Sequence, residues 1–296
     1  MTQILKGSEL AARLRGEITA SITDLLGRGG RAPLLVTVLV GRSPSSEAYR
    51  ASIERTTSRV GIGHRPIELA SATTEFEFIR EIHALNADPE VTAVLVLMPL
   101  PEQLNPHAVL EHLSPLKDVD GITPTNAGRL HLGLPSLQPS TPQGGLELLD
   151  HYGIEIEGKN VCVIGRSNVV GRPMASLFMQ RNGTVTICHR KTVDLAHFTR
   201  QADLVAIAAG HPGLVHAGMI RRGTIILDFG VNVLRDKLVG DADFDGLLGI
   251  AGAITPVPGG TGPVTALVLA RNAVAAGYAA LAGNLDHVEM VRAAQF

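Results

Sequence analysis

The stretch NVCVIGRSNVVGRPMASLFMQRNGTVTICHRKT, residues 160–192, decides the fold of this chain. A short apolar run ends at Gly165, a polar turn leads to Gly171, and a helix-like stretch follows. Asn182-Gly183 ends that stretch, and a second β-rich run comes next. A strand, a helix and a second strand within roughly 30 residues predict a βαβ unit. Glycine at the end of the first strand lets backbone N–H groups approach a pyrophosphate at the helix N-terminus.

The residues around this unit indicate which dinucleotide it binds. The glycine pattern departs from G-x-G-x-x-G, because Ser167 replaces the middle glycine and Gly171 comes one residue late. A site for NAD usually carries an acidic residue about 20 residues on, which holds the ribose 2′-hydroxyl. This chain has His189-Arg190-Lys191 there, so we predict NADP rather than NAD, with Arg166 and Arg190 at the 2′-phosphate. The alternative is that Arg190 and Lys191 are only the solvated end of a strand and bind no phosphate.

Length and composition bound the class of protein. A chain of 296 residues predicts two domains. A net charge of −2 and a pI of about 6.6 give no basic field for nucleic acid or an acidic membrane. Cys162 and Cys188 lie in apolar runs, which favours buried thiols in a reducing compartment. The uncharged stretch 246–270 is broken by prolines, so we expect no membrane helix there and a cytoplasmic protein. The histidines show no metal spacing, and no metal is predicted.

Helical and apolar runs alternate along the rest of the chain. The first third predicts a three-layer α/β domain, with strands at 34–40, 67–69 and 92–98 and helices at 8–26, 45–59 and 74–85. Residues 114–138 show no obvious regular structure, which is typical of a functional segment. The second half predicts further strands at 203–208 and 223–229, an alanine-rich helix at 265–281 and a last amphipathic helix at 284–296.

Eight ordered motifs resemble the methylenetetrahydrofolate dehydrogenase/cyclohydrolase family. They are VGRSPSSEAY (40–49), LMPLP (97–101), KDVDG (117–121), PTNAGRL (124–130), TPQG (141–144), GRSNVVGRP (165–173), DFGVN (228–232) and PVPGGTGP (256–263). The resemblance spans about residues 5–281. It implies two three-layer α/β domains, the second a Rossmann-type parallel sheet, with the folate in the cleft between them. The implied folate domain is residues 1–140 plus 270–296, and the implied NAD(P)-binding domain is residues 141–269. Homodimers are usual in the family.

The resemblance also implies the site residues. Tyr49 matches the tyrosine that packs against the folate ring, and Asp120 matches the aspartate that binds the pterin amino edge. A carboxylate suits the adjacent N–H donors of a pterin. Both are therefore expected to serve catalysis and binding of a tetrahydrofolate derivative. The other implied substrate-binding residues are Pro258, Gly259 and Gly260, and the cofactor-binding residues are Thr141, Gly165, Arg166, Ser167, Gly171, Arg190 and Asn232.

Two positions depart from the family pattern. The family's Y-x-x-x-K places its catalytic lysine where this chain has Ile53. The glutamine of Q-L-P-L-P, which holds that lysine, is Leu97 here. Loss of one partner alone would leave the other buried and unsatisfied, which is costly. Two aliphatic replacements therefore indicate one consistent change of a pocket wall.

The departures predict the activity. Hydride transfer from 5,10-methylenetetrahydrofolate needs positioning and a dry site, and no protein group must take a proton. Hydrolysis of the methenyl product needs a tuned acid/base. The sequence therefore predicts an NADP-dependent 5,10-methylenetetrahydrofolate dehydrogenase that lacks cyclohydrolase activity. The alternatives are a bifunctional enzyme with a relocated acid/base, a specialised paralogue acting on another one-carbon substrate, and a non-catalytic folate- or NADP-binding protein.

Overall fold

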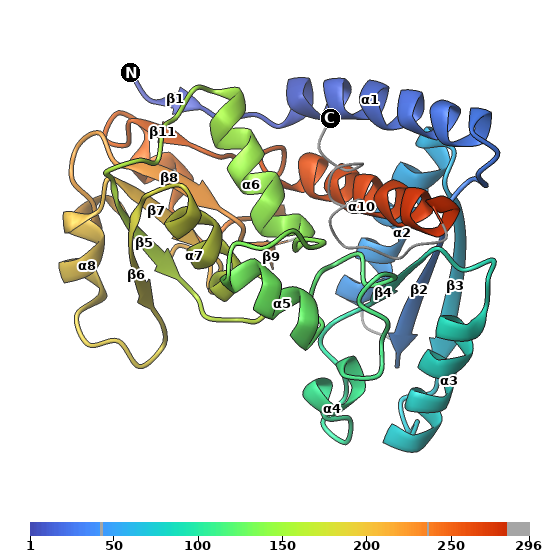
Figure 1. The fold of residues 1–296 in the computed structure, drawn as a ribbon. Helices are drawn as coiled ribbons and strands as arrows, with labels where there is room; N and C mark the ends of the chain where they lie inside the picture. The colour runs from blue at the N-terminus through green and yellow to red at the C-terminus, as the bar shows by residue number, and fades with distance from the viewer. Residues whose placement is uncertain (42–43, 236, 283–296) are drawn as a thin grey trace. The chain divides into compact units, whose positions relative to one another are not determined.

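The computed structural model describes residues 1–41, 44–235 and 237–282, so the helix predicted at 284–296 lies outside the described residues. The chain divides into two compact units (Figure 1). The first unit combines Met1–Ala12 with Thr141–Thr265, and the second combines Arg13–Ser140 with the chain from Ala266 onward.

The first unit is built on a six-stranded sheet in which neighbouring strands are parallel. Its strands, in sheet order, are β1 (Gln3–Ile4), β11 (Ala253–Ile254), β8 (Ile225–Asp228), β7 (Leu204–Ile207), β5 (Asn160–Ile164) and β6 (Thr184–Cys188). The chain adds β6 on one side of β5 and then crosses back to add β7 on the other side of β5. Doubly wound nucleotide-binding sheets show the same reversal of strand order.

The N-terminus differs from the sequence-based domain division. Residues 1–12, predicted in the same domain as residues 13–140, group with the first unit instead. The reason is β1, in which Gln3 pairs with Ala253 and Ile4 pairs with Ile254. A two-residue strand carries no periodic signal, so its partner is visible only in the fold.

Helices cover both faces of this sheet. On one face Cys162, Ile207 and Ile226 pack with Leu195 of α8 (Leu195–Gln201) and Leu247 of α9 (Phe244–Leu247). On the other face lie α6 (Ser140–His151) and α7 (Gly171–Gln180) (Figure 1). A short 3-10 helix, η1 (Ala217–Met219), precedes β8. The result is the three-layer arrangement that a parallel sheet buried on both faces requires.

The second unit contains a three-stranded parallel sheet in the order β3 (Gly63–Leu69), β2 (Leu34–Val40), β4 (Ala93–Val96). Its helices are α2 (Pro44–Val60), α3 (Glu75–Ala87), α4 (Pro106–Leu110), α5 (Pro124–His131) and most of α1 (Ser8–Gly27) and α10 (Gly262–Ala282). The apolar run of β2 is buried at the centre. The strand predicted at 67–69 is four residues longer at its start, since Gly63 pairs with Leu34.

The sequence patterns did not predict helices α5, α8 and α9. Residues 114–138 contain α5, whose first turn is capped by Thr123. The Thr123 hydroxyl accepts a hydrogen bond from the backbone N–H of Asn126 at 3.4 Å, and Pro124 stands at the first helical position. Both features favour a helix start, but eight residues are too few for a clear apolar period.

Among the described residues, α10 is long and apolar enough to span a membrane by length and composition. However, 78% of its most apolar window is buried inside the protein. The hydroxyl of Tyr278 also donates to the carbonyl of Ser21 in α1 at 2.9 Å. The helix is therefore part of the protein core.

Candidate functional site

The turn between β5 and α7 requires glycine at two positions. Gly165 has φ of +126°, and a Cβ there would lie 2.3 Å from the carbonyl oxygen of Ala208. A Cβ on Gly171 would lie 2.2 Å from the carbonyl oxygen of Gly165. No side chain fits either position without moving backbone. The close approach of the two loop ends places the first turn of α7 against the end of β5.

Ser167, which stands where the fingerprint has its middle glycine, holds the loop on the helix. Its hydroxyl accepts hydrogen bonds from the N–H groups of Val170 at 3.1 Å and Gly171 at 3.4 Å. Its carbonyl accepts from the N–H of Arg172 at 3.0 Å. Because the hydroxyl accepts both bonds, its own proton can be donated to a bound phosphate.

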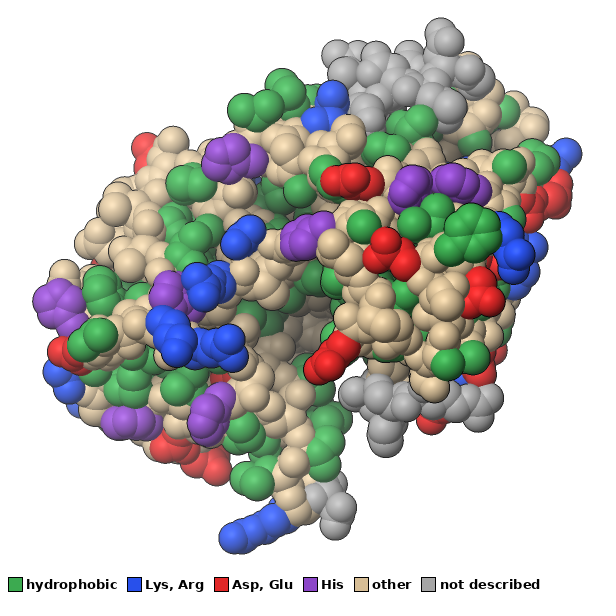
Figure 2. Space-filling model, turned by 90° about the horizontal axis from the view of Figure 1, so that it is seen from below, with side chains coloured by type: hydrophobic (Ala, Val, Ile, Leu, Met, Phe, Trp, Pro, Cys, Tyr) green, Lys and Arg blue, Asp and Glu red, His purple; other side chains and the backbone are tan. Residues whose placement is uncertain are grey.

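Two cations lie at the ends of the adjacent strands β5 and β6. The N–H of Gly165 donates to the carbonyl of Cys188 at 2.9 Å, which joins these ends. After Cys188 a turn forms in which the N–H of His189 donates to the Thr192 hydroxyl at 2.9 Å. Arg166 and Arg190 are exposed, and within the described ranges neither pairs with a carboxylate. Figure 2 shows Lys and Arg side chains gathered with His side chains on the left of this face.

The sequence analysis did not identify Asp241, whose carboxylate holds the loop at residues 209–211 after β7. Asp241 is fully buried, and its carboxylate accepts hydrogen bonds from the backbone N–H groups of Ala209 (2.7 Å), Gly210 (2.9 Å) and His211 (2.8 Å). It also accepts from the side-chain amide of Asn232 at 2.8 Å. Asn232, predicted to bind the cofactor, therefore donates its N–H within the protein. The short GDADF sequence gave no signal for this role.

The predicted loop of Pro258, Gly259 and Gly260 is anchored to the N-terminal segment of the same unit. Gly259 has φ of +104°, and its carbonyl accepts from the N–H of Gly7 at 2.9 Å. Pro258 and Gly259 are exposed, whereas Gly260 is buried. Thr141, the second residue of α6, is half-buried.

In the second unit, Ile53 and Leu97, which the sequence analysis interprets as departures from the family pattern, are part of the core. Ile53 is 1% exposed and Leu97 is 3% exposed. Tyr49 and Ile53 are four residues apart on α2, so their side chains are neighbours on one face of this helix. Leu97 follows β4, where its N–H donates to the carbonyl of Val38 at 2.9 Å.

Asp120 lies in a hydrogen-bonded group with Ser140 and Tyr49. The Ser140 hydroxyl donates to Asp120 Oδ1 at 2.9 Å, and the Ser140 N–H donates to the same oxygen at 3.3 Å. A side-chain hydrogen bond joins Ser140 to Tyr49. Burial raises the pKa of Asp120 to about 7, the charge of Asp118 adds to this, and the Ser140 bonds oppose it. Tyr49 is 37% exposed as a residue. Desolvation of its hydroxyl, and next the Asp120 charge, raise the pKa of Tyr49, so the hydroxyl stays protonated.

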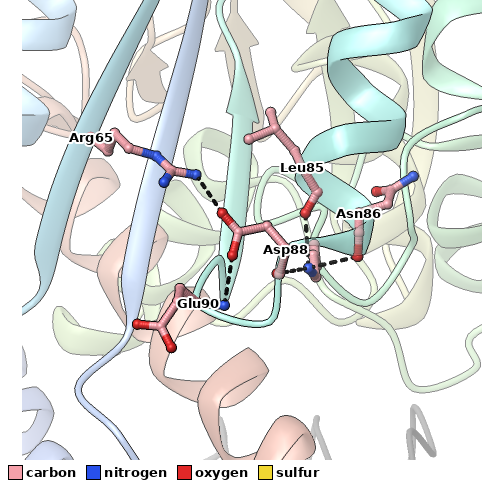
Figure 3. A network of polar contacts seen from close by, with 6 residues as sticks. Arg65, Leu85, Asn86, Asp88 and Glu90 are labelled. Carbon is pink, nitrogen blue, oxygen red and sulfur yellow. Dashed lines mark hydrogen bonds and ion pairs between the residues drawn. The ribbon is translucent and has the colours of Figure 1, made fainter.

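The residues just before Asp120 shape its loop. The ammonium of Lys117 donates to the carbonyls of Leu85 (2.9 Å), Asn86 (2.9 Å) and Asp88 (2.8 Å) at the end of α3. Asp88 in turn bonds Arg65 at 3.0 Å (Figure 3). A cation is favourable at a helix C-terminus. Lys117 is therefore engaged in holding the loop on α3.

Asp118 fixes the other side of this loop. Its buried carboxylate accepts from the N–H of Thr123 at 2.8 Å and from the side-chain amide of Asn126 at 3.0 Å. Gly121 has φ of +60°, and a Cβ there would lie 2.3 Å from the carbonyl of Leu137. These contacts position Asp120. In the part of the chain that the structure describes, no three His, Cys, Asp or Glu side chains gather as a metal site.

The parallel sheet, the glycine turn at β5 and the exposed cations beside it define a dinucleotide-binding α/β protein. Two family models match the chain. The catalytic domain of tetrahydrofolate dehydrogenase/cyclohydrolase matches residues 5–120, and the NAD(P)-binding domain of the same family matches residues 139–280. The chain belongs to the tetrahydrofolate dehydrogenase/cyclohydrolase family.

Similar proteins extend over nearly the whole chain. The bifunctional protein FolD of Chloroflexus aurantiacus is 46% identical over 275 residues, which cover 93% of this chain and 96% of the relative. The crystal structure of FolD from Campylobacter jejuni has a TM-score of 0.90 and 39% identity, covering 94% of this chain and 99% of that one. The FolD of Trypanosoma brucei, complexed with NADP cofactor and an inhibitor, has a TM-score of 0.87 and 34% identity, covering 92% and 96%.

These matches confirm the resemblance predicted from the eight motifs and the two-domain α/β fold with a parallel sheet. They also confirm the prediction of an NADP-dependent oxidoreductase of tetrahydrofolate one-carbon metabolism. The roles of the individual site residues stay predictions.

Proposed function

We propose that this chain is an NADP-dependent 5,10-methylenetetrahydrofolate dehydrogenase that lacks methenyltetrahydrofolate cyclohydrolase activity. The observation that carries the proposal is the burial of Ile53 and Leu97, which occupy the family's lysine and glutamine positions. Neither side chain can exchange a proton.

The remaining residues suffice for dehydrogenation. The folate nitrogens push the hydride out, so the protein must position the substrate and exclude water. Asp120 can accept from the pterin N–H groups, and Tyr49 can pack on the ring. The aliphatic Ile53 also removes a positive charge that would oppose the methenyl cation as it forms.

Hydrolysis makes a different demand. A water molecule must lose a proton as it attacks the methenyl carbon, and the intermediate must exchange protons before it opens. Arg50 and Arg55 lie on the same helix as Ile53, but a guanidinium does not readily give up its proton. The aliphatic side chains of Ile53 and Leu97 therefore favour loss of this step.

The cofactor side fits NADP. Gly165 and Gly171 let the two ends of the loop close on each other, which leaves the N-terminus of α7 to face a pyrophosphate, and Ser167 retains a proton to donate. Arg166 and Arg190 are exposed cations suited to a 2′-phosphate. NADP bound there would supply the hydride acceptor.

A second candidate function rests on Asp120. A carboxyl group with a pKa of about 7 is matched to acid/base catalysis at neutral pH. In a bifunctional enzyme Asp120, linked to Ser140, would take the part of the missing lysine. The curated relatives that the chain matches carry the name bifunctional protein FolD.

A paired assay of the purified protein separates these functions. One arm follows methenyltetrahydrofolate formation from methylenetetrahydrofolate with NADP⁺ and then with NAD⁺. The other arm supplies methenyltetrahydrofolate and follows hydrolysis. We expect NADP⁺-dependent oxidation, with hydrolysis at the uncatalysed rate. Hydrolysis well above that rate would favour the bifunctional enzyme. If neither oxidation nor hydrolysis is detected, another substrate or a binding role is favoured.

We also infer a homodimer, and the hairpin that follows β8 supports it. Strands β9 (Asn232–Leu234) and β10 (Lys237–Val239) pair only with each other among the described residues. Val233 is 73% exposed and Leu238 is 48% exposed. Exposed apolar side chains on a strand edge favour association, and a second copy would present the same surface around a two-fold axis.

Substitution of Val233 by glutamate is expected to convert the dimer to a monomer, because it places a charge in this apolar surface. Light scattering coupled to size-exclusion chromatography measures the mass. Val193→Glu is the matched control, since Val193 is 87% exposed in a loop outside the hairpin. A dimer that persists in the Val233 variant would place the interface elsewhere.

A cytoplasmic location is proposed on two grounds. The thiols of Cys162 and Cys188 are buried and free, with their sulfur atoms 3.7 Å apart. Neighbouring free thiols are typical of a reducing compartment. The apolar helix α10 is mostly buried in the protein, so it offers no membrane anchor.

A further inference from the structure

Ser140 joins the two predicted folate-contacting side chains. It is fully buried, and it bonds Asp120 through its hydroxyl and its backbone N–H. It is also joined to the Tyr49 side chain by a hydrogen bond. The three residues come from the start of α6, the loop after Asp118 and α2, and all belong to the second unit. One hydroxyl thus connects three distant parts of the chain.

The bonds leave one oxygen of Asp120 available. Both Ser140 bonds go to Oδ1, and among the described residues no hydrogen bond to Oδ2 is found. Asp120 is 9% exposed, so that oxygen lies at the margin of the core. A carboxylate oxygen with open acceptor capacity suits an N–H donor of a ligand.

Ser140 matters more for holding Asp120 in this chain than it would in a protein with a lysine at position 53. Where the family has an ammonium and an amide, this chain has the buried side chains of Ile53 and Leu97. Neither can donate to a carboxylate. Ser140 is therefore the side chain that hydrogen bonds Asp120 in the part of the chain that the structure describes.

We propose that Ser140 is a positioning residue for folate binding, which holds Asp120 Oδ1 and the Tyr49 hydroxyl so that Oδ2 accepts from the pterin N–H groups. The inference rests on the proposed function, because it takes a reduced folate as the ligand.

The charge of Asp120 gives this role a pH dependence. Burial and the neighbouring Asp118 raise the pKa of Asp120 to about 7, while the hydrogen bonds from Ser140 lower it. The titratable groups beside it are Asp118 on its own loop, which raises the pKa of Asp120, and Tyr49 on α2, whose own pKa is raised by the Asp120 charge. The ionised carboxylate is the form that accepts two pterin N–H groups, so binding is strong above the pKa and falls as pH drops through it. Removal of the Ser140 hydroxyl takes away a lowering influence, so the pKa rises and the fall begins at higher pH.

The test measures the Kd of 5-formyltetrahydrofolate between pH 6 and 9 by calorimetry, for the whole chain without NADP. In Ser140→Ala we expect the acid limb to shift up by about one pH unit, which weakens binding about fivefold at pH 7 and about tenfold below pH 6. In the dehydrogenase assay KM for the folate should rise with kcat changed less than about threefold, because uniform binding is lost. Ser140→Cys should lie between wild type and Ser140→Ala, since a thiol is a weaker donor.

Ser136→Ala is the matched control. The Ser136 hydroxyl is also buried in the second unit and has no hydrogen-bond partner, so its loss should leave the pH profile unchanged. An unshifted profile in a folded Ser140→Ala protein overturns the inference. If that variant does not fold, Ser140→Cys decides, and a profile equal to wild type overturns it. A wild-type protein that binds the folate but does not oxidise methylenetetrahydrofolate contradicts only the proposed function.

Discussion

Replacement of Arg190 by alanine is expected to weaken NADP binding by about 10- to 100-fold and to change NAD binding less than about threefold. A hydrogen bond to a charged group contributes about 1.5–3 kcal/mol, and each 1.4 kcal/mol corresponds to roughly a factor of ten in Kd. Arg190 is exposed in the turn after β6, and NAD lacks the 2′-phosphate that this cation would hold. Titration with NADPH and NADH, followed by fluorescence, gives both constants.

The control for Arg190 is Lys159→Ala, which removes one positive charge just before β5, at the opposite end of that strand. It should leave both constants unchanged. Equal losses of NADP and NAD affinity in the Arg190 variant would contradict the phosphate assignment. In that case Arg190 would act on a part of the nucleotide that the two cofactors share.

Most of the fold follows from local patterns. The βαβ unit was predicted because Gly165, Gly171 and the apolar runs beside them lie within one short stretch. The strand at 34–40 was predicted within its observed bounds, since an uninterrupted apolar run of that length is typical of a buried parallel strand. The helix at 74–85 is confirmed as α3, where Thr74 and Glu77 form a capping box.

Features that depend on distant residues could not be predicted in this way. The pairing of Gln3 with Ala253 is set by the sheet, not by the two-residue strand itself. Asp241 gains its importance from three N–H groups that lie about 30 residues before it in the chain. The hydrogen bond from Ser140 to Asp120 likewise joins residues 20 apart. The sequence motifs predicted Asp120 as a site residue, but its hydrogen bonds to Ser140 are visible only in the fold.

The double variant Ile53→Lys, Leu97→Gln is expected to gain cyclohydrolase activity. General acid/base catalysis contributes about 10²–10⁴-fold, so hydrolysis of methenyltetrahydrofolate should exceed the wild-type rate by at least about a hundredfold. Tyr49 and residue 53 are one helical turn apart, so a lysine there would stand beside the predicted folate-contacting ring. Loss of methenyl absorbance, corrected for the uncatalysed rate, measures the gain.

The two substitutions should depend on each other. Ile53→Lys alone places an ammonium where the side chain is 1% exposed, and an unpaired buried cation loses its proton or destabilises the fold. The glutamine offers that ammonium an acceptor, so the double variant should be more stable than the single one. Ile53→Met, Leu97→Met is the matched control: it nearly keeps the apolar volume and should oxidise the substrate without hydrolysing the product. A folded double variant that oxidises methylenetetrahydrofolate but does not hydrolyse the methenyl product would contradict the proposal that Ile53 and Leu97 abolish cyclohydrolase activity.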